Sequence, residues 1–231
     1  MRDPWPVRAM AGPAGAIGPT SDWEKLYATS DVATLPWYMS GLDPDLERAL
    51  KAHRLRGGRI LDLGTGPATQ AMNLAKRGFD VIATDISPSA IKKAKASAKV
   101  AGLSIRFLVD NVLASKLAPN LVDVIVDRGV FHVLPLNRRP VYVRTVHRVL
   151  RPNGWLFLKC FSDKEPGTWG PHRIAEPKLR GYFREPFEIR SVVETVFQGN
   201  VAPSPRALFA TFRRRATPTP PRRVQKRDRK R

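Results

Sequence analysis

Short apolar runs alternate with amphipathic stretches between about residues 59 and 159. Each apolar run has the length of a strand, and each intervening stretch carries apolar residues at helical spacing. Such alternation favours a parallel sheet with helices on both faces. We therefore predict a doubly wound, Rossmann-like α/β fold, with successive strands beginning near residues 59, 79, 105, 121 and 155.

Glycine, proline and serine mark the ends of the predicted helices. The first crossover helix, residues 68–77, stops before Gly78, a typical residue after a helix end. Ser87 followed by Pro88 begins the second. A further helix covers about residues 139–150, where the apolar positions again fall on one face.

Two later segments, residues 187–197 and 206–214, alternate apolar and polar residues, as half-buried antiparallel strands do. They raise the expected count to seven strands, with the last two forming a hairpin at one edge and the last strand antiparallel. The connection before them, residues 161–186, is long for a compact domain and is expected to hold a short helix near 174–183.

A glycine-rich turn follows the first strand, in the sequence RILDLGTGPATQA. Glycines let backbone amides approach a ligand closely, and a helix that begins behind them points free amides at the same place. A dinucleotide fingerprint needs three glycines, G-x-G-x-x-G, whereas here Gly64 and Gly66 are followed by Thr69. The turn predicts a nucleotide-type site, and the acid Asp62 just before it is unusual for dinucleotide enzymes.

Acidic residues also end the next three predicted strands. Asp85 ends the second strand, where an acid accepts hydrogen bonds from ribose hydroxyls. Asp110 and Asn111 follow the third strand, and Asp127 follows the fourth. The turn VLRPNG precedes the fifth strand.

These ordered motifs resemble the class I S-adenosylmethionine (SAM) methyltransferases, whose first motif is D-x-G-x-G-x-G. The resemblance covers about residues 22–215, and Ala68 stands at the third glycine position. Alanine disfavours positive φ, so we predict ordinary helix-type backbone there.

The resemblance implies SAM as the cofactor, with Asp85 on the ribose and Asp110 on the adenine amine. The residues it assigns to the cofactor are Asp62, Gly64, Thr65, Gly66, Asp85, Ile86, Asp110, Asn111 and Asp127.

Large aromatic residues gather before the first strand, including Trp23, Tyr27 and Trp37. Their order resembles the small-molecule methyltransferases of the thiopurine, halide and tellurite-resistance type. That resemblance implies that residues 21–55 form an N-terminal lid over the cofactor, with 22–42 as its mobile part. Plain core packing is the competing interpretation for each aromatic.

The predicted catalytic residues are Asp127, Arg128 and His132, because they follow the fourth strand and face the reaction zone by topology. His132 is either a general base or a structural histidine. Arg128 either holds an anionic substrate or pairs with Asp127. The function expected is methyl transfer to a small-molecule acceptor through a sulfur, oxygen or nitrogen nucleophile. A non-catalytic SAM-fold module is a third interpretation.

Charge adds a second candidate function. The 231 residues carry a net charge of +20, and residues 213–231 alone hold ten basic residues and one acid. We expect a methyltransferase domain at residues 21–215 between a disordered leader, 1–20, and a disordered basic tail, 216–231. The tail is either a tether for RNA or another anionic partner, which would make this an RNA or protein methyltransferase, or a solubilising end.

Other classes are disfavoured. With Cys160 as the one cysteine, no intramolecular disulfide can form, and the four histidines show no metal-site spacing, so we expect no metal. No apolar run approaches the length of a membrane span, and the first twenty residues lack the apolar core of a secretory signal. We expect a cytoplasmic protein that is a monomer or a weak dimer.

Overall fold

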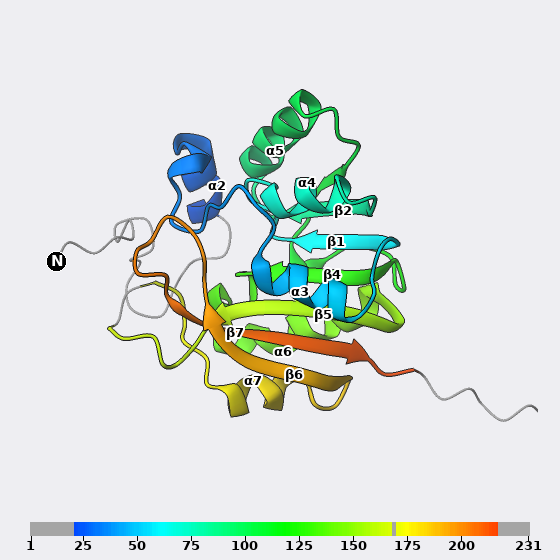
Figure 1. Cartoon of the computed structure of the whole chain (residues 1–231). Helices are drawn as coiled ribbons and strands as arrows, with labels where there is room; N and C mark the ends of the chain where they lie inside the picture. The colour runs from blue at the N-terminus through cyan, green and yellow to red at the C-terminus, as the bar shows by residue number, and fades with distance from the viewer. Residues whose placement is uncertain (1–20, 168–169, 217–231) are drawn as a thin grey trace, which may run out of the picture.

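The computed structural model describes residues 21–167 and 170–216. Seven strands form one sheet in the order β3-β2-β1-β4-β5-β7-β6 (Figure 1). The strands are β1 (Arg59–Leu63), β2 (Asp80–Asp85), β3 (Arg106–Val109), β4 (Val122–Arg128), β5 (Leu150–Phe161), β6 (Phe187–Val196) and β7 (Arg206–Arg214). The first five pair in parallel, and β7 pairs antiparallel with both β5 and β6. This confirms the predicted fold class and the antiparallel last strand.

Helices cover both faces of the sheet. They are α2 (Ser21–Thr29), α3 (Pro44–Ala52), α4 (Thr69–Ala75), α5 (Pro88–Val100), α6 (Arg139–Val149) and α7 (Glu176–Phe183). Adjacent residues of β1 show the division: Ile60 packs with α3, α4 and α5, whereas Leu61 packs with α6 and α7. Because side chains alternate along a strand, a sheet buried on both faces needs apolar residues at nearly every position.

The predicted turn before the fifth strand lies inside β5 instead. Asn153 has a left-handed φ of 64°, and the pairing register of β4 with β5 shifts between Val122 and Val124. A Cβ on Gly154 would lie 2.8 Å from the Arg151 carbonyl oxygen, so only glycine fits this close approach. The turn is therefore an irregularity within a long strand, which a local sequence pattern does not distinguish from a loop.

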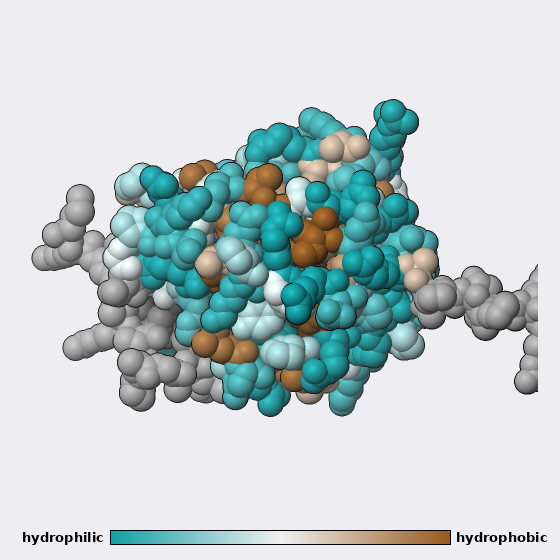
Figure 2. Space-filling view, turned by 90° about the horizontal axis from the view of Figure 1, so that it is seen from below, coloured by the Kyte–Doolittle hydropathy of each residue, from teal (hydrophilic) through white to brown (hydrophobic). Residues whose placement is uncertain are grey.

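The edge strand β6 exposes Val193 and Val196. The face of the molecule seen in Figure 2 is mostly hydrophilic, with hydrophobic residues in small separate groups. No helix among the described residues is long and apolar enough to cross a membrane. The predicted leader, and all of the predicted tail beyond residue 216, lie outside the described residues.

Candidate active site at the carboxyl ends of the strands

A cavity of about 740 Å³ lies at the carboxyl ends of the parallel strands. This is where ligands bind in open α/β sheets, and the volume suits an organic ligand. It gathers all but one of the residues predicted to bind the cofactor: Asp62, Gly64, Thr65, Gly66, Asp85, Ile86, Asp110 and Asn111.

The glycine-rich turn between β1 and α4 has the left-handed backbone that its sequence indicates. Gly64 has a φ of 67° and Gly66 a φ of 47°. A Cβ on Gly64 would lie 2.1 Å from a methyl carbon of Val130, and one on Gly66 would lie 2.4 Å from the Tyr27 hydroxyl oxygen. Glycine is thus required for both the conformation and the close packing of this cavity wall.

The prediction of helix-type backbone at Ala68 was wrong, because this residue has φ 60° and ψ 19°. Its N–H donates to the Thr65 carbonyl oxygen at 2.8 Å, and its own carbonyl oxygen accepts from Met72 N–H at 2.8 Å. The turn therefore needs a left-handed residue before α4, at a cost of about 1–2 kcal/mol for a residue with a Cβ. That position is the third glycine of the family pattern.

Asp62 and Asp85 organise this turn through their carboxylates. Asp62 Oδ2 accepts from the Thr65 hydroxyl at 2.6 Å and from Ala71 N–H at 3.2 Å, and burial raises the Asp62 pKa to about 6. Asp85 accepts from Gly66 N–H at 2.9 Å and from Ser87 N–H at 3.0 Å, and burial raises its pKa as well. A carboxylate has about four acceptor positions, so both keep capacity for a ligand.

Asp110 provides a test of whether the cavity fits SAM. Its Oδ1 accepts from Lys116 N–H at 3.1 Å, whereas its Oδ2 is buried with no hydrogen-bond partner. A buried unpaired acceptor is costly unless a ligand supplies a donor. The adenine amine of SAM is such a donor, so the residues present fit this cofactor. The neighbouring Asn111 caps a short 3₁₀ turn by accepting from Leu113 N–H at 2.9 Å.

Asp127 is the predicted cofactor residue that does not line the cavity. Its carboxylate accepts from Val130 N–H at 2.7 Å, from Phe131 N–H at 3.0 Å and from the Tyr142 hydroxyl at 2.5 Å. Burial raises the Asp127 pKa to about 6. The geometry favours a structural role for Asp127 on the α6 side of the sheet, and its predicted catalytic and cofactor roles stay predictions.

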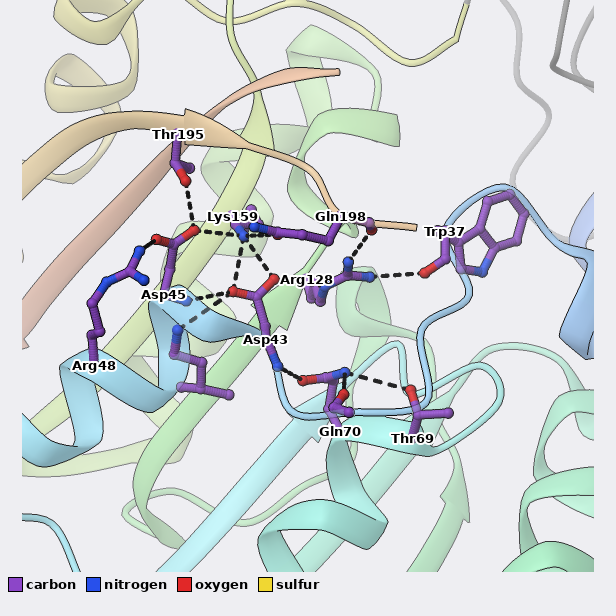
Figure 3. Close-up of polar contacts among 12 residues, drawn as sticks. Trp37, Asp43, Asp45, Arg48, Thr69, Gln70, Arg128, Lys159, Thr195 and Gln198 are labelled. Atoms are coloured by element: carbon purple, nitrogen blue, oxygen red, sulfur yellow. Dashed lines mark hydrogen bonds and ion pairs between the residues drawn. The ribbon is translucent and has the colours of Figure 1, made fainter. Parts of the chain in front are cut away.

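Arg128 lines the cavity, and each of its three nitrogens already donates a hydrogen bond to the protein, as the close-up of Figure 3 shows. Nε donates to Asp43 Oδ2 at 2.9 Å, Nη1 donates to the Trp37 carbonyl oxygen at 2.9 Å, and Nη2 donates to the Gln198 carbonyl oxygen. Its guanidinium carbon lies 4.5 Å from the centre of the Phe197 ring. Arg128 therefore pairs with Asp43 and not with Asp127, and it holds two residues of the cavity wall, Trp37 and Phe197.

Lys159 completes a buried charge cluster that sequence reasoning missed. Its ammonium lies 2.7 Å from Asp43 Oδ2 and 2.6 Å from Asp45 Oδ2, and it donates to Gln198 Oε1 at 2.8 Å (Figure 3). Burial would raise the Asp43 pKa, but Lys159 and Arg128 hold it below its usual value. A lysine inside the apolar run of β5 was the available signal, because buried lysines are almost always paired.

The three predicted lid aromatics meet at the cavity. The Trp37 ring lies 5.8 Å from Trp23 and 6.5 Å from Tyr27, centre to centre. Tyr27 is buried, and burial raises its pKa. Glu24 joins α2 to the start of α5 by accepting from the Ser87 hydroxyl at 2.5 Å. The structure brings these residues together, and their closure over a ligand stays a prediction.

His132 is buried at the cavity wall. Its Nδ1 accepts from Phe161 N–H at 3.0 Å, which leaves the proton of the neutral ring on Nε2. Burial, together with the positive charge of Arg139, lowers the His132 pKa to about 3. The imidazole is therefore neutral at physiological pH, but its lone pair is engaged, so the geometry favours the structural role over the general base.

The rest of the cavity wall is largely apolar. Besides the aromatics, it includes Val130, Val133, Leu134, Pro135, Phe161, Pro171 and Phe197, with the polar Thr69, Gln70, Thr84, Asn137 and Arg138. No group of three or more metal-ligating side chains occurs within residues 21–167 and 170–216.

Comparison with known proteins agrees with this arrangement. A family model described as a methyltransferase domain matches residues 60–154. The chain is similar to the 2-heptyl-1-hydroxyquinolin-4(1H)-one methyltransferase of Mycobacteroides abscessus, with 29% identity over 148 residues. That match covers 63% of this chain and 65% of the relative. Other similar proteins are named as methyltransferases of a protein lysine and of a tRNA uridine.

Solved structures extend the similarity to the whole fold. One, described as the conversion of a disulfide bond into a thioacetal group during echinomycin biosynthesis, has a TM-score of 0.75 and 25% identity. It covers 85% of this chain and 93% of that chain. The TehB structure from Haemophilus influenzae has a TM-score of 0.62 and 22% identity, over 76% of this chain and 63% of that chain. The fold, the cavity and these matches together support a SAM-dependent methyltransferase, with its methyltransferase domain matched at residues 60–154.

Proposed function

We propose that this protein transfers the methyl group of SAM to a small, largely apolar acceptor. The observation that carries the proposal is one continuous cavity with two unlike parts. Three carboxylates, Asp62, Asp85 and Asp110, line one part, and the rest is mostly aromatic and aliphatic, with a few polar side chains such as Arg128, Asn137 and Arg138. The first part suits the cationic cofactor, and the second suits a flat or apolar small molecule.

Asp85 would hold the ribose hydroxyls, Asp110 would accept from the adenine amine, and the turn around Gly64 and Gly66 would lie against the cofactor. When bound, SAM supplies a methyl carbon on a positively charged sulfur, which is a good leaving group. The protein then has to align the acceptor and exclude water. Trp37 and Phe197, both held by Arg128, are placed to do so at the apolar end.

Two of the matches support a small-molecule acceptor. The Mycobacteroides relative is named for an N-hydroxyquinolone, and the structural neighbour with a TM-score of 0.75 is described by sulfur chemistry. The predicted alternative, an RNA or protein methyltransferase recruited by the basic tail, has no such support in the cavity. The loop after β4 reads Asp127-Arg128-Gly129-Val130 and lacks the Asn/Asp-Pro-Pro-aromatic pattern of enzymes that methylate exocyclic amines.

Methyl transfer from labelled SAM tests this proposal. The full chain would be offered thiols, phenols, N-hydroxy heterocycles and bulk tRNA in separate reactions. We expect label in one or more of the small molecules and none in tRNA. Label in tRNA alone would establish the alternative, and binding of NAD without SAM would overturn the cofactor assignment.

A further inference from the structure

Three aromatic side chains from distant parts of the chain form one wall of the cavity. Trp37, Phe161 and Phe197 all line the cavity and pack in one hydrophobic cluster. The rings of Phe161 and Phe197 lie 5.5 Å apart, centre to centre. We call these three residues the acceptor wall. All three lie outside residues 60–154, the part that the methyltransferase family model matches, so the wall belongs to what distinguishes this chain within that family.

Asn200 connects the two segments that carry the outer residues of this wall. Its Nδ2 donates to the Ala33 carbonyl oxygen at 2.7 Å and to the Leu35 carbonyl oxygen at 2.9 Å. Its N–H donates to the Pro36 carbonyl oxygen at 2.8 Å. One residue thus bonds the segment before α3, just ahead of Trp37, to the segment after β6.

Gly199 lets these two segments touch. A Cβ at Gly199 would lie 2.2 Å from the Pro36 carbonyl oxygen and 3.1 Å from Trp37 Cα. Gly199 is not among the residues with a positive φ. A side chain is therefore excluded by the close approach of the other segment and not by the conformation of Gly199 itself.

Arg128 holds the same two segments from the cavity side (Figure 3). It donates to the carbonyl oxygens of Trp37 and Gln198, and its guanidinium carbon lies 4.5 Å from the centre of the Phe197 ring. The wall is therefore held from two sides. Neither Gly199 nor Asn200 lines the cavity, so any effect that these two residues have on a ligand passes through the wall.

We infer that residues 33–38 and 197–200 form one unit that opens and closes together, and that Gly199 and Asn200 are positioning residues for a flat acceptor. The inference rests on the proposed function. A flat molecule packs well against aromatic rings only where their spacing is kept, because dispersion attraction falls steeply across small gaps. Contact between the two segments keeps Trp37 in place beside Phe197. The carboxylates of the cofactor part are held by other contacts, so cofactor binding does not depend on this unit.

Hydrogen exchange of the full chain tests whether the two segments form one unit, and it needs no acceptor. The amides of Tyr38 and Asn200 donate to the carbonyl oxygens of Leu35 and Pro36. In the wild type they should have similar protection, as amides of one cooperatively opening unit do. Asn200→Ala removes the two side-chain bonds and should lower the protection of both segments by about tenfold.

Asn73→Ala is the matched control for this experiment. Asn73 Nδ2 also donates to two carbonyl oxygens, those of Ser40 at 2.9 Å and Thr69 at 2.8 Å, neither of which lies in the segment after β6. The control should leave the protection of residues 197–200 unchanged. Unequal protection of the two segments in the wild type would overturn the inference. So would a loss confined to one segment, or no loss in either, in Asn200→Ala.

Gly199→Ala tests whether the unit positions the acceptor, because it pushes the segments apart without touching the cavity. Calorimetry on the full chain measures the affinity for S-adenosylhomocysteine and, on protein saturated with it, for 2-naphthol as a flat probe. Gly199→Ala should weaken 2-naphthol binding by about tenfold, since even a gap of about 1 Å removes much of the dispersion attraction. Its affinity for S-adenosylhomocysteine should stay that of the wild type. Gly41→Ala is the control, because a Cβ at Gly41 would meet nothing within 4 Å, and it should match the wild type for both ligands.

Unchanged 2-naphthol binding in Gly199→Ala would refute the positioning role. Equal losses for 2-naphthol and S-adenosylhomocysteine would also refute it, because they would show a general structural effect. A wild type that binds S-adenosylhomocysteine but not 2-naphthol would overturn the assignment of the wall to flat acceptors. Failure of the proposed function is a separate result, since it would show as an absence of methyl transfer in the labelled-SAM screen.

Discussion

At the scale of single residues, Asp85 shows how one carboxylate serves both the fold and the ligand. Its carboxylate accepts from the amides of Gly66 and Ser87, and Asp85 also lines the cavity. Asp127 lies near the end of β4, which is two strands away from β2 in the sheet. Its carboxylate, however, already accepts from Val130 N–H, Phe131 N–H and the Tyr142 hydroxyl. Position at a strand end thus does not by itself assign a role.

Asp85→Asn should weaken SAM binding by about 1.5–3 kcal/mol, the range for a hydrogen bond to a charged group. Calorimetry on folded protein measures the affinity directly. Asp80→Asn is the control, because Asp80 lies on the same strand with an exposed side chain paired to Arg59. An unchanged affinity in Asp85→Asn would contradict the ribose assignment.

His132 should make stability depend on pH in the acid range. Its pKa in the folded protein is about 3, below the ordinary value of 6.5, so the unfolded chain binds the proton more readily. The contribution of His132 to stability is therefore complete above pH 6.5 and is lost as the pH falls toward 3. Relative to His132→Gln, the wild type should lose about 1.4 kcal/mol of unfolding free energy per pH unit within that window. Urea unfolding at several pH values checks this, and parallel curves for the two proteins would refute it.

At the scale of elements, the buried charge cluster connects segments that are distant in the sequence. Lys159 on β5 and Arg128 on β4 bind the start of α3, the Trp37 backbone and the segment after β6. Truncating one partner of a buried pair leaves uncompensated charge behind, which costs much more than losing an exposed pair.

Lys159→Met should therefore lower the free energy of unfolding by about 3–5 kcal/mol, because it leaves Asp43 and Asp45 buried without their ammonium partner. Arg151→Met removes a half-exposed pair with Asp123 and should cost less than about 1 kcal/mol. Denaturant unfolding of both variants gives the comparison. Similar losses in the two would mean that the cluster contributes no more than a surface ion pair.

The aromatic segment, residues 22–42, is expected to order further when the cofactor product binds. It precedes the sheet and places Trp23, Tyr27 and Trp37 at the cavity. Hydrogen exchange should show this segment weakly protected in the free protein and more protected with S-adenosylhomocysteine, because closure excludes water from the site. Equal protection in both states would make these aromatics ordinary core, and would remove the lid from the proposed mechanism.

At the scale of the whole molecule, the two layers of helices and the sheet form a domain whose described part ends at residue 216, shortly after β7. The basic tail that follows has no apolar period to bury. Truncation after Arg215 should leave thermal stability, SAM affinity and turnover of small molecules unchanged. Loss of activity in a folded, SAM-binding truncated protein would instead show that the tail recruits the substrate.

The sequence by itself determined the strands, their parallel arrangement and the location of the cavity. Strand and helix periodicities are local, and parallel strands place their carboxyl ends at one edge, so Asp62, Asp85 and Asp110 had to converge there. The left-handed backbone at Gly64 and Gly66 could also be predicted, because glycine is the residue that most readily adopts it.

Only the tertiary structure decided which strand-end side chains face the ligand. Asp127 turns toward Tyr142 on α6, and Arg128 binds groups 70, 85 and 91 residues away. The left-handed backbone of Ala68 and the insertion of β7 between β5 and β6 were not evident from the sequence pattern either. The strand order and the partners of Asp127 and Arg128 depend on contacts between distant segments, which no short stretch of sequence encodes. The Ala68 conformation is set locally, by hydrogen bonds with Thr65 and Met72, and was missed because alanine does not mark a left-handed residue.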